Sequence, residues 1–300
     1  MICSICIATY KRPKLLKDLL NSLVAQVISE DVGLEIIIVD NDPAGSGESV
    51  YKKFSNTKQF EFLYFIQPIK NISLTRNMAV KKATGEYILF IDDDEVASPE
   101  WVTTLLKTIK DFDADGVFGR VISNVNNKAS EWIKRNYLFN RPSSATGTEA
   151  ISTRTGNCIV KASLLKGVPG PFDPTYGLTG GSDSHLFYSL RQKGAKFVNC
   201  YEAWVSEFVP PERTRISWLL RRAFRKGNTY TRKIIDSAGK RRRIIKVTAS
   251  IRAICLVSIN LFLIFIASPS KIWQTHWTLK TAEQLGRFFA VFGCFYQEYK

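Results

Sequence analysis

The chain has 300 residues, enough for one large domain with an appendage, and its 45% hydrophobic and 23% charged residues are ordinary for a globular protein. It contains no low-complexity tract or internal repeat, which argues against fibrous and repeat architectures. The net charge of +15 leaves nucleic acid, anionic lipid and phosphorylated substrates open as partners.

The N-terminus shows no predicted targeting segment. The stretch MICSICIATYKRP has no basic n-region, and its apolar run is too short for a signal peptide, so we expect this part of the chain to stay in the cytoplasm. Cys3 and Cys6 share a predicted strand, where their odd separation sends them to opposite faces and makes a poor metal pair. We expect reduced, buried thiols at all six cysteines: Cys3, Cys6, Cys158, Cys200, Cys255 and Cys294.

Four apolar runs predict buried strands in the first third of the chain. They span residues 2–8, 34–40, 60–66 and 87–92. Because helical patterns alternate with these near-continuously apolar runs, we expect an α/β fold with a mostly parallel sheet covered on both faces. Ligands bind such sheets at the carboxyl ends of the strands. Thr9, Asp40 and Asp92 stand at those ends.

The helices between these strands carry their own start and stop signals. Leucines at helical spacing follow Pro13, which is tolerated in a first turn. The next helix is predicted to begin at Ser73 as its cap and to stop at Gly85. Ser98 and the proline after it open a further helix.

The second half of the chain is less regular up to Pro210, where its character changes. Residues 116–122 predict a strand, and residues 123–153 are polar and loop-like. A strand, a helix and a strand follow at 156–160, 182–194 and 195–200. We therefore divide the chain into a domain over 1–210 and a basic, hydrophobic helical tail over 211–300.

The most informative motif is a run of four acids, Asp92 to Glu95, directly after a predicted buried strand. Adjacent carboxylates repel one another unless a cation lies between them. Asp92 and Asp94 are one residue apart and can point at the same hard cation. Mg²⁺ typically keeps several waters and bridges to substrate phosphates through one or two carboxylates.

Three alternative roles for the acidic run fit the sequence less well. Capping the helix after Ser98 would need one aspartate, not four acids. A phosphatase of the haloacid-dehalogenase type places its D-x-D strand near the N-terminus, whereas three strands come first here. A Walker B acid would need a G-x-x-x-x-G-K-[ST] loop, and the sequence has none.

Four blocks of sequence together resemble family 2 glycosyltransferases with the Rossmann-like GT-A fold. They are ATYKRP, VDND, TRNMAVKKATGEYILFIDDDEVASPEW, and GNCIVKASLL followed by GGSDSHLFYSLRQKGAKF. The resemblance covers roughly residues 2–230 and is closest to bacterial exopolysaccharide and cell-surface glycan transferases. It implies transfer of a sugar from a nucleotide-diphosphate sugar, with UDP as the expected nucleotide.

The resemblance also implies roles for single residues. Thr9 and Tyr10 would line the nucleotide pocket, with Tyr10 against the base, and Asp40 would accept a hydrogen bond from uracil. Arg76 would lie near the base or the phosphates. The remaining donor-binding residues it implies are Arg12, Asp92, Asp93 and Gly181. Asp92 would contact the ribose or the metal, and Asp94 would bind the Mg²⁺ or Mn²⁺ that bridges the diphosphate.

Asp183 matches the second residue of the family's Glu-Asp pair, the general base, although Ser182 replaces the glutamate. A base takes the proton of the acceptor hydroxyl, and the metal neutralises the leaving diphosphate. A single base implies inversion, because a retaining double displacement would need a second carboxylate as nucleophile. Gly181 and the glycine before it would allow close approach of the backbone to the sugar. Glu207 stands where the family often has a histidine, and its contact with the metal is left open.

Three further residues have a structural role or two alternative roles. His185 does not share a helix face with Asp183, so we expect a packed or exposed helix residue. Asn157 would either touch the sugar or bond to backbone. Trp132 would stack on a sugar ring or serve as a buried anchor.

Most of the positive charge is concentrated in the tail. Fourteen lysines and arginines lie between Arg213 and Arg252, opposed only by Glu212 and Asp236, a net charge of +12. Apolar residues form one stripe among these basic residues: Ile216, Leu219, Leu220 and Phe224. This pattern is typical of a helix on an anionic membrane surface, on the cytoplasmic face.

The apolar segment 253–267 would span about 22 Å as a helix, short of the roughly 30 Å of a bilayer core. We favour membrane embedding, with crossing and re-entrant forms both open and a buried core helix as the alternative. Residues 285–299 would pair with it as a hairpin. Acceptors would then be lipid-linked glycans, whose phosphates would meet Arg221, Arg222 and Arg225.

Two other functions are kept as alternatives. A nucleic-acid-binding protein would be basic, but no recognisable module is present and the aromatic residues are not interleaved as stacking platforms. A nucleotidyltransferase that makes nucleotide sugars would share the sheet and the acids, but it usually carries a glycine-rich loop where this chain has ATYKRP.

Overall fold

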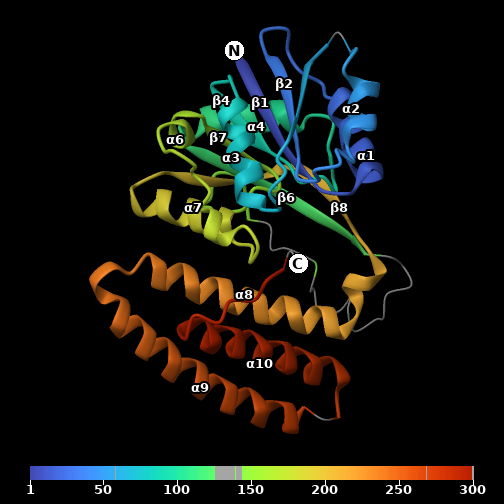
Figure 1. Cartoon of the computed structure of the whole chain (residues 1–300). Coiled ribbons are helices and arrows are strands. Elements are labelled where there is room, and N and C mark those ends of the chain that lie inside the picture. The colour runs from blue at the N-terminus through green and yellow to red at the C-terminus, as the bar shows by residue number, and fades with distance from the viewer. Residues whose placement is uncertain (58, 126–138, 140–143, 268, 299–300) are drawn as a thin grey trace. The chain divides into compact units, whose positions relative to one another are not determined.

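The computed structural model describes the chain except residues 58, 126–138, 140–143, 268 and 299–300. It divides into two compact units, drawn in Figure 1. The sheet unit comprises Met1–Asn124, Arg141–Leu178 and Ser182–Phe208. The helical unit comprises Val125–Asn140, Thr179–Gly181 and Val209–Lys300.

The sheet unit is built on an eight-stranded sheet of order β3-β2-β1-β4-β7-β6-β8-β5, which confirms the α/β class. The strands are β1 (Ile2–Thr9), β2 (Gly33–Asp40), β3 (Glu61–Ile66), β4 (Tyr87–Phe90), β5 (Glu95–Ala97), β6 (Gly116–Val125), β7 (Cys158–Lys161) and β8 (Phe197–Val209). The pairs β1–β2, β2–β3 and β1–β4 are parallel. The pairs β4–β7, β6–β7 and β5–β8 are antiparallel, so the parallel arrangement is confined to one half of the sheet.

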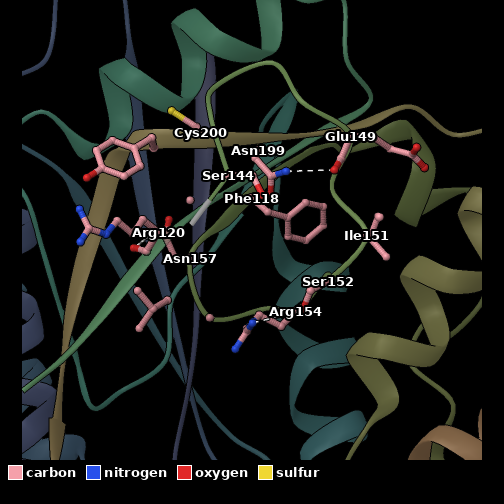
Figure 2. A pocket seen from close by; sticks show the side chains of 14 residues that line it. Phe118, Arg120, Ser144, Glu149, Ile151, Ser152, Arg154, Asn157, Asn199 and Cys200 are labelled. Atoms are coloured by element: carbon pink, nitrogen blue, oxygen red, sulfur yellow. Dashed lines mark hydrogen bonds between the residues drawn. The ribbon is translucent and has the colours of Figure 1, made fainter. Parts of the chain in front are cut away.

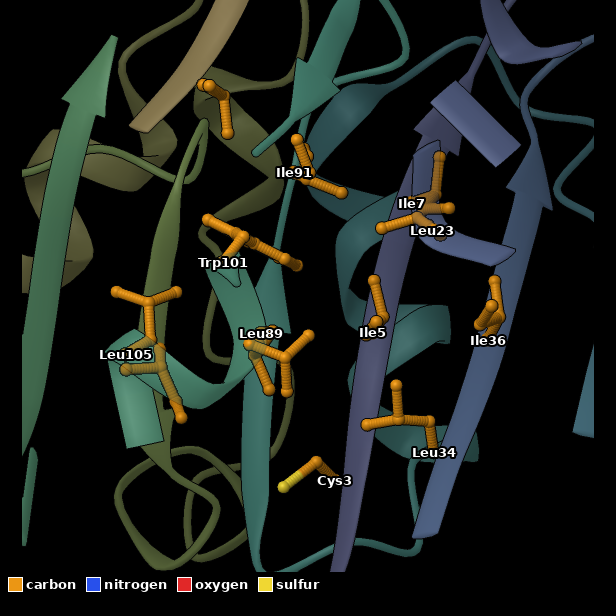
Figure 3. Close-up of a cluster of buried hydrophobic side chains, with 14 of the residues drawn as sticks. Cys3, Ile5, Ile7, Leu23, Leu34, Ile36, Leu89, Ile91, Trp101 and Leu105 are labelled. Atoms are coloured by element: carbon orange, nitrogen blue, oxygen red, sulfur yellow. The ribbon is translucent and has the colours of Figure 1, made fainter. Parts of the chain in front are cut away.

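Two hydrophobic cores cover the two faces of the sheet. The first packs α1 (Pro13–Val24), α2 (Glu48–Phe54) and α4 (Trp101–Asp111) on one face, and Figure 3 shows part of it. The second packs α3 (Ile72–Lys82), α6 (Ser163–Lys166) and α7 (Ser182–Gln192) on the other face. Cys3 belongs to the first core and Cys6 to the second, which confirms that the two thiols point to opposite faces.

The prediction of the α3 start is wrong by two residues. The Asn71 side chain, not Ser73, caps the helix: its Oδ1 accepts from the amides of Ser73 (3.0 Å) and Leu74 (3.1 Å). The helix ends at Lys82, before Gly85, because Gly85 packs against β1. An added Cβ there would lie 2.7 Å from both the Ile2 carbonyl oxygen and the Ser4 Oγ.

The helical unit consists mainly of three long helices. They are α8 (Ile216–Asp236), α9 (Arg242–Ile266) and α10 (Lys271–Val291), and α10 packs against both of the others, as Figure 1 shows. The short 3₁₀ helices along the chain are η1 (Pro174–Tyr176), η2 (Pro211–Thr214) and η3 (Gly239–Arg241). The apolar segment 253–267 is the end of α9, and its expected partner begins earlier than residue 285 and stops at Val291.

Glycines let α8 and α10 approach closely. A Cβ on Gly227 would lie 1.9 Å from the Glu283 carbonyl oxygen, and a Cβ on Gly286 would lie 1.9 Å from the Phe224 carbonyl oxygen. Neither helix could keep this crossing with a side chain at those positions.

The outer side of α9 is apolar and exposed. Among the described residues, one helical stretch, residues 239–266, is long and apolar enough to cross a membrane. Only 11% of the most apolar 18 residues of this stretch are buried inside the protein. Such a low buried share is not that of a core helix. Cys255 and Cys294 are exposed here, so the expectation of six buried thiols is wrong for these two.

Candidate active site

Most of the predicted donor-site residues lie at or just after the carboxyl ends of β1, β2 and β4. Thr9 and Asp40 are paired neighbours at the ends of β1 and β2. The acidic run forms the turn between β4 and β5. Parallel strands that run side by side end at the same edge of the sheet, which is why residues far apart in sequence gather here.

Arg12 links two of the acids to the start of α1. Its Nη1 donates to Asp93 Oδ1 at 3.0 Å and to Asp94 Oδ2 at 3.2 Å. The Thr9 hydroxyl donates to the other oxygen of Asp93 at 2.9 Å. Burial raises the pKa of Asp93 to about 6, against the opposing effect of the Arg12 charge, and the neighbouring Asp94 adds to the rise. Asp93 is therefore a structural residue, more deeply buried than the carboxylates of Asp92 and Asp94.

Asp92 is the most accessible acid of the run. Its side chain is 46% exposed, and its Oδ1 accepts from Arg76 Nη2 at 3.5 Å. Its amide donates to Glu95 Oε2 at 3.0 Å, which fixes the turn. Gly156 lies against both acids, since a Cβ there would be 2.8 Å from Asp92 Oδ2 and 2.9 Å from Glu95 Oε1.

Gly156 and its neighbour Thr155 were missed at the sequence level. Thr155 is buried, and its hydroxyl has no hydrogen-bond partner among the described residues. It lines a small hollow together with Arg76 and Asp92. The motif GNCIV predicts a strand, but only the tertiary fold brings its first residue, Gly156, and the preceding Thr155 against the acidic turn.

Asp40 is fully buried and bonded within the protein. Its carboxylate accepts from the amides of Asp42 (2.9 Å) and Gly47 (2.7 Å), and from the hydroxyls of Tyr64 (2.8 Å) and Ser46 (3.4 Å). These bonds shape the loop after β2. A bond to uracil would compete with them, so the base-binding role of Asp40 stays a prediction.

Tyr10 lies among basic groups at the end of β1. The ammonium groups of Lys11 and Lys70 are 5.3 and 5.0 Å from the centre of its ring. Lys11 has a φ of 54°, an unfavourable backbone conformation for a residue with a side chain, and its amide donates to the Ser46 hydroxyl. The ring and the nearby positive charges suit a base and a phosphate group.

Asp183 lies in the first turn of α7, where its Oδ1 accepts from the Ser184 amide at 2.7 Å. Cys158 lies buried at the start of β7. Burial raises the pKa of Cys158, and the negative charges of Asp92 and Asp183 both add to this rise. Both carboxylates therefore act on the same buried thiol.

The other singled-out residues have structural partners. Asn157 is fully buried and bonds to Trp101 Nε1 (2.7 Å) and to the carbonyl oxygens of Arg120 and Ala203 (2.8 and 2.9 Å), so it satisfies internal groups. His185 stacks on Tyr176 with ring centres 4.9 Å apart, which confirms a packed helix residue.

Glu207 lies on β8 opposite Glu95 in the strand register, and it accepts from the Ser123 hydroxyl at 3.5 Å. Trp132 lies outside the described residues. Gly181 belongs to the helical unit, and its φ of 92° is a backbone conformation that favours glycine; its approach to the sugar stays a prediction.

The arginines expected to meet lipid phosphates have neighbours in the helical unit. Arg225 pairs with Glu298 at 2.7 Å, and Arg222 lies over the rings of Phe139 and Trp218 at 5.5 and 5.3 Å. Arg221 is exposed.

The carboxylate pair Asp92 and Asp94 fits a divalent cation that is shared with substrate. Oxygen donors are the ligands that Mg²⁺ and Mn²⁺ accept, and Mg²⁺ needs only one or two protein carboxylates when phosphates and waters complete its shell. Among the described residues, no group of three or more His, Cys, Asp or Glu is arranged to hold a metal by itself. The protein thus offers a partial set of ligands.

A cavity of about 190 Å³ lies in the sheet unit. Figure 2 shows it between β6, β8 and the loop 144–157, with Arg120, Arg154 and Asn199 among its lining residues. Arg120 lies 4.6 Å from the centre of the Tyr201 ring, and Asn199 Nδ2 donates to the Glu149 carbonyl oxygen at 3.0 Å. Gly156 lines this cavity and also contacts Asp92, so the two places are neighbours.

Solved structures share this fold, which is GT-A-like. TarS of S. aureus, crystallised as residues 1–349 in complex with UDP, matches with a TM-score of 0.56 at 17% identity, covering 99% of this chain and 93% of that one. GalNAc-T7 with UDP, GalNAc and Mn²⁺ matches with a TM-score of 0.58 at 13% identity, covering 78% of this chain and 47% of that one. These likenesses define the architecture of the sheet unit as GT-A-like.

The chain belongs to glycosyl transferase family 2, whose family model matches residues 4–166. The succinoglycan biosynthesis protein ExoM of Rhizobium meliloti is 32% identical over 233 residues, covering 77% of this chain and 75% of that protein. The glucosyl-dolichyl phosphate glucuronosyltransferase of Haloferax volcanii is 24% identical over 246 residues, covering 77% of this chain and 76% of that protein.

Proposed function

We propose that the protein is an inverting, metal-dependent glycosyltransferase of bacterial polysaccharide or surface-glycan synthesis. It moves a sugar from a UDP-sugar to a lipid-linked glycan at the cytoplasmic face of the membrane. The observation that carries this proposal is the exposed Asp92 beside Asp94 at the strand ends, flanked by Arg12 and Arg76. The relatives' names support glycan synthesis, a nucleotide donor, a divalent metal and a phosphate-linked lipid.

Different residues of the chain bind different parts of the donor. Tyr10 offers a ring for the base, and Lys11, Lys70 and Arg76 offer positive charge to the diphosphate. Asp92 and Asp94 would hold Mg²⁺ or Mn²⁺, which when bound neutralises the charge that develops on the leaving diphosphate. Arg12 keeps Asp94 and the buried Asp93 in place through its bonds to both.

Asp183 acts on the acceptor in this proposal. Its carboxylate takes the proton of the acceptor hydroxyl as that oxygen bonds to the anomeric carbon, and the bond from this carbon to the diphosphate oxygen breaks. One carboxylate on the acceptor side gives inversion. The cavity lined by Arg120 and Asn199 is large enough for a sugar ring next to Asp92.

The apolar, exposed side of α9 and the basic residues before it support the membrane location. Hydrophobic burial of α9 and attraction of the basic residues to anionic lipid would act together. A lipid-linked acceptor would then reach the site from the bilayer.

A donor screen tests the activity. Full-length protein in detergent is incubated with UDP- and other nucleotide-sugars, a lipid-linked acceptor extract and Mg²⁺, and release of nucleoside diphosphate is measured. We expect release that depends on acceptor, that stops in excess chelator, and that falls about 10²–10⁴-fold in Asp183→Asn, the usual effect of losing a general base. Asp111→Asn, an exposed aspartate at the end of α4, is the matched control.

The outcomes separate the alternatives. Full activity in excess chelator contradicts the metal. When the nucleotide-sugar is replaced by a nucleoside triphosphate and a sugar 1-phosphate, release of pyrophosphate would indicate a nucleotidyltransferase. Loss of nucleotide affinity in Asp183→Asn would make that residue a binding residue and not the base.

A further inference from the structure

A short segment before α7, Thr179–Gly181, belongs to the helical unit through its contacts with α8. Arg232 of α8 donates from Nη1 to the Thr179 hydroxyl at 3.0 Å. Both residues are buried, with exposed fractions of 7% and 9%. A buried bond from a charged donor is among the stronger hydrogen bonds of a protein, because water does not compete for it.

The Thr179 hydroxyl connects Arg232 to the next peptide group through two hydrogen bonds. It donates to the Gly180 carbonyl oxygen at 3.3 Å while it accepts from Arg232. Gly180 and Gly181 have φ angles of 76° and 92°, so two consecutive residues adopt a conformation that side chains disfavour. A Cβ on Gly181 would lie 2.1 Å from Thr229 Cγ2, so the turn also lies directly against α8.

This turn leads straight into the proposed base. Ser182 begins α7, and Asp183 is its second residue. A glycine pair has the most backbone freedom of any dipeptide, so an unrestrained turn here would let the first residues of α7 shift. The bond from Arg232 and the contact with Thr229 remove that freedom.

Arg232 has enough other partners to stay ordered without Thr179. Its guanidinium carbon lies 4.3 Å from the centre of the Phe295 ring, and its Nε lies 3.4 Å from Asp236 Oδ2. The bond to Thr179 is therefore an added constraint on the turn, not the only support of the arginine.

We propose that Arg232 is a positioning residue: acting through Thr179, it holds the Gly180–Gly181 turn and thereby the carboxylate of Asp183 in its productive place. This inference rests on the proposed role of Asp183 as the base. It predicts a specific kinetic effect, because a small displacement of a catalytic group slows the reaction while donor binding elsewhere is unaffected.

The test compares Thr179→Val, which removes the hydroxyl at nearly constant shape, with Arg232→Gln and with the double variant. We expect kcat for sugar transfer to fall about 10- to 10²-fold in each single variant, with KM for the donor and Kd for UDP unchanged. The double variant should be no slower than the slower single variant, because both changes break the same bond. Thr179→Ser should recover activity.

Arg287→Gln is the matched control in the same unit. Arg287 Nη2 donates to Glu283 at 2.7 Å, and its guanidinium carbon lies 4.6 Å from the Tyr230 ring centre, so it is another partly buried arginine that pairs with an acid and an aromatic ring. We expect it to lower the melting temperature without a matching loss of kcat. If Thr179→Val or Arg232→Gln does not fold, Thr179→Ala and Arg232→Lys are compared in the same way, again with Thr179→Ser as the variant that keeps the hydroxyl.

Several outcomes overturn the inference. Wild-type kcat in Thr179→Val, additive losses in the double variant, an equal loss in Arg287→Gln, or a change confined to donor KM each would do so. These results leave the proposed function intact when Asp183→Asn is still inactive. Full transfer by Asp183→Asn, or no transfer by the wild-type chain with any donor, would overturn the proposed function and this inference together.

Discussion

Single residues of the acidic turn differ in how much their surroundings constrain them. The Asp92 side chain is 46% exposed, while Asp93 is almost fully buried between Thr9 and Arg12. The four acids look equivalent in sequence. In the turn after β4, however, successive side chains point in different directions, so their exposure differs. The exposed Asp92 and the partly exposed Asp94 suit binding, and the buried Asp93 and Glu95 support the turn.

Gly156→Ala should reduce transfer by about tenfold or more. The new Cβ would lie 2.8 Å from Asp92 Oδ2 and 2.9 Å from Glu95 Oε1, so the turn that presents Asp92 must move. Steady-state kinetics with the donor identified by the screen measure this. Gly167→Ala is the control, because its Cβ meets only the Ser163 carbonyl oxygen at 3.5 Å, an ordinary contact. Equal activity of the two variants would contradict the arrangement at Gly156.

Asp93 should make the metal-free protein less stable as the pH rises from about 4 to 7. The pKa of Asp93 is about 6 in the folded chain, against 3.8 for an ordinary aspartate such as that of the unfolded chain. Between these two pH values the folded chain binds a proton that the unfolded chain does not. The stability gained from this proton is lost as the pH rises through about 6. The shift corresponds to about 3 kcal/mol.

Chemical denaturation in chelator at a series of pH values measures this contribution. Asp93→Asn should remove this part of the pH dependence of the free energy of unfolding. Asp18→Asn, an exposed residue of α1, should keep the wild-type slope. An Asp93→Asn profile parallel to the wild type would show that Asp93 titrates normally.

Elements of the sheet unit follow their hydrophobic patterns closely, and their ends follow tertiary contacts. The strand over 2–8 and the helix after Pro13 form as expected. The three-residue strand β5 was not expected, because its three residues carry too little pattern and it exists only by pairing with β8. The start of α3 is set by Asn71, which also donates to the Pro174 carbonyl oxygen at 3.0 Å.

Asn71→Ala and Ser73→Ala distinguish the two candidate caps of α3. Loss of a cap typically costs about 1 kcal/mol, so Asn71→Ala should lower the free energy of unfolding by at least that amount. Ser73→Ala should be neutral or stabilising, since the buried Ser73 hydroxyl has no partner among the described residues. Thermal and urea denaturation measure both. The reverse ranking would restore Ser73 as the cap.

For the whole molecule, the exposed apolar side of α9 is the feature that a soluble enzyme would not need. Phe262 and Phe265 are 64% and 79% exposed, and the helix begins with the basic residues Arg242 and Arg243. Large exposed apolar surfaces usually mark interaction sites. The proposed membrane location follows from this surface and from the charge beside it.

The full-length protein should sediment with vesicles that contain anionic lipid and should resist extraction by high salt. Salt screens the charge contribution only, and burial of apolar side chains is insensitive to it. Replacing Phe262 and Phe265 together by Asp should release the protein, since burying each phenylalanine is worth about 1.5–3 kcal/mol. Ile151→Asp, an equally exposed apolar residue of the sheet unit, is the control. Wild-type protein that stays in the supernatant would contradict the membrane location.

The sequence by itself determined the features that depend on local pattern. The alternation of strands and helices, the place of Thr9, Asp40 and Asp92 at strand ends, and the family all follow from residues close together in the chain. Periodicity and motif spacing are local properties, so no tertiary information is needed to read them.

Only the tertiary structure decided which polar groups bond to one another. It assigned Asn157 to internal bonds, placed Gly156 against Asp92 and Glu95, and tied Thr179 to Arg232, which follows it by 53 positions. Sequence separation carries no information about such contacts, because they form only when the sheet and the helices have packed. Burial then fixes them, since a buried polar group without a partner is costly.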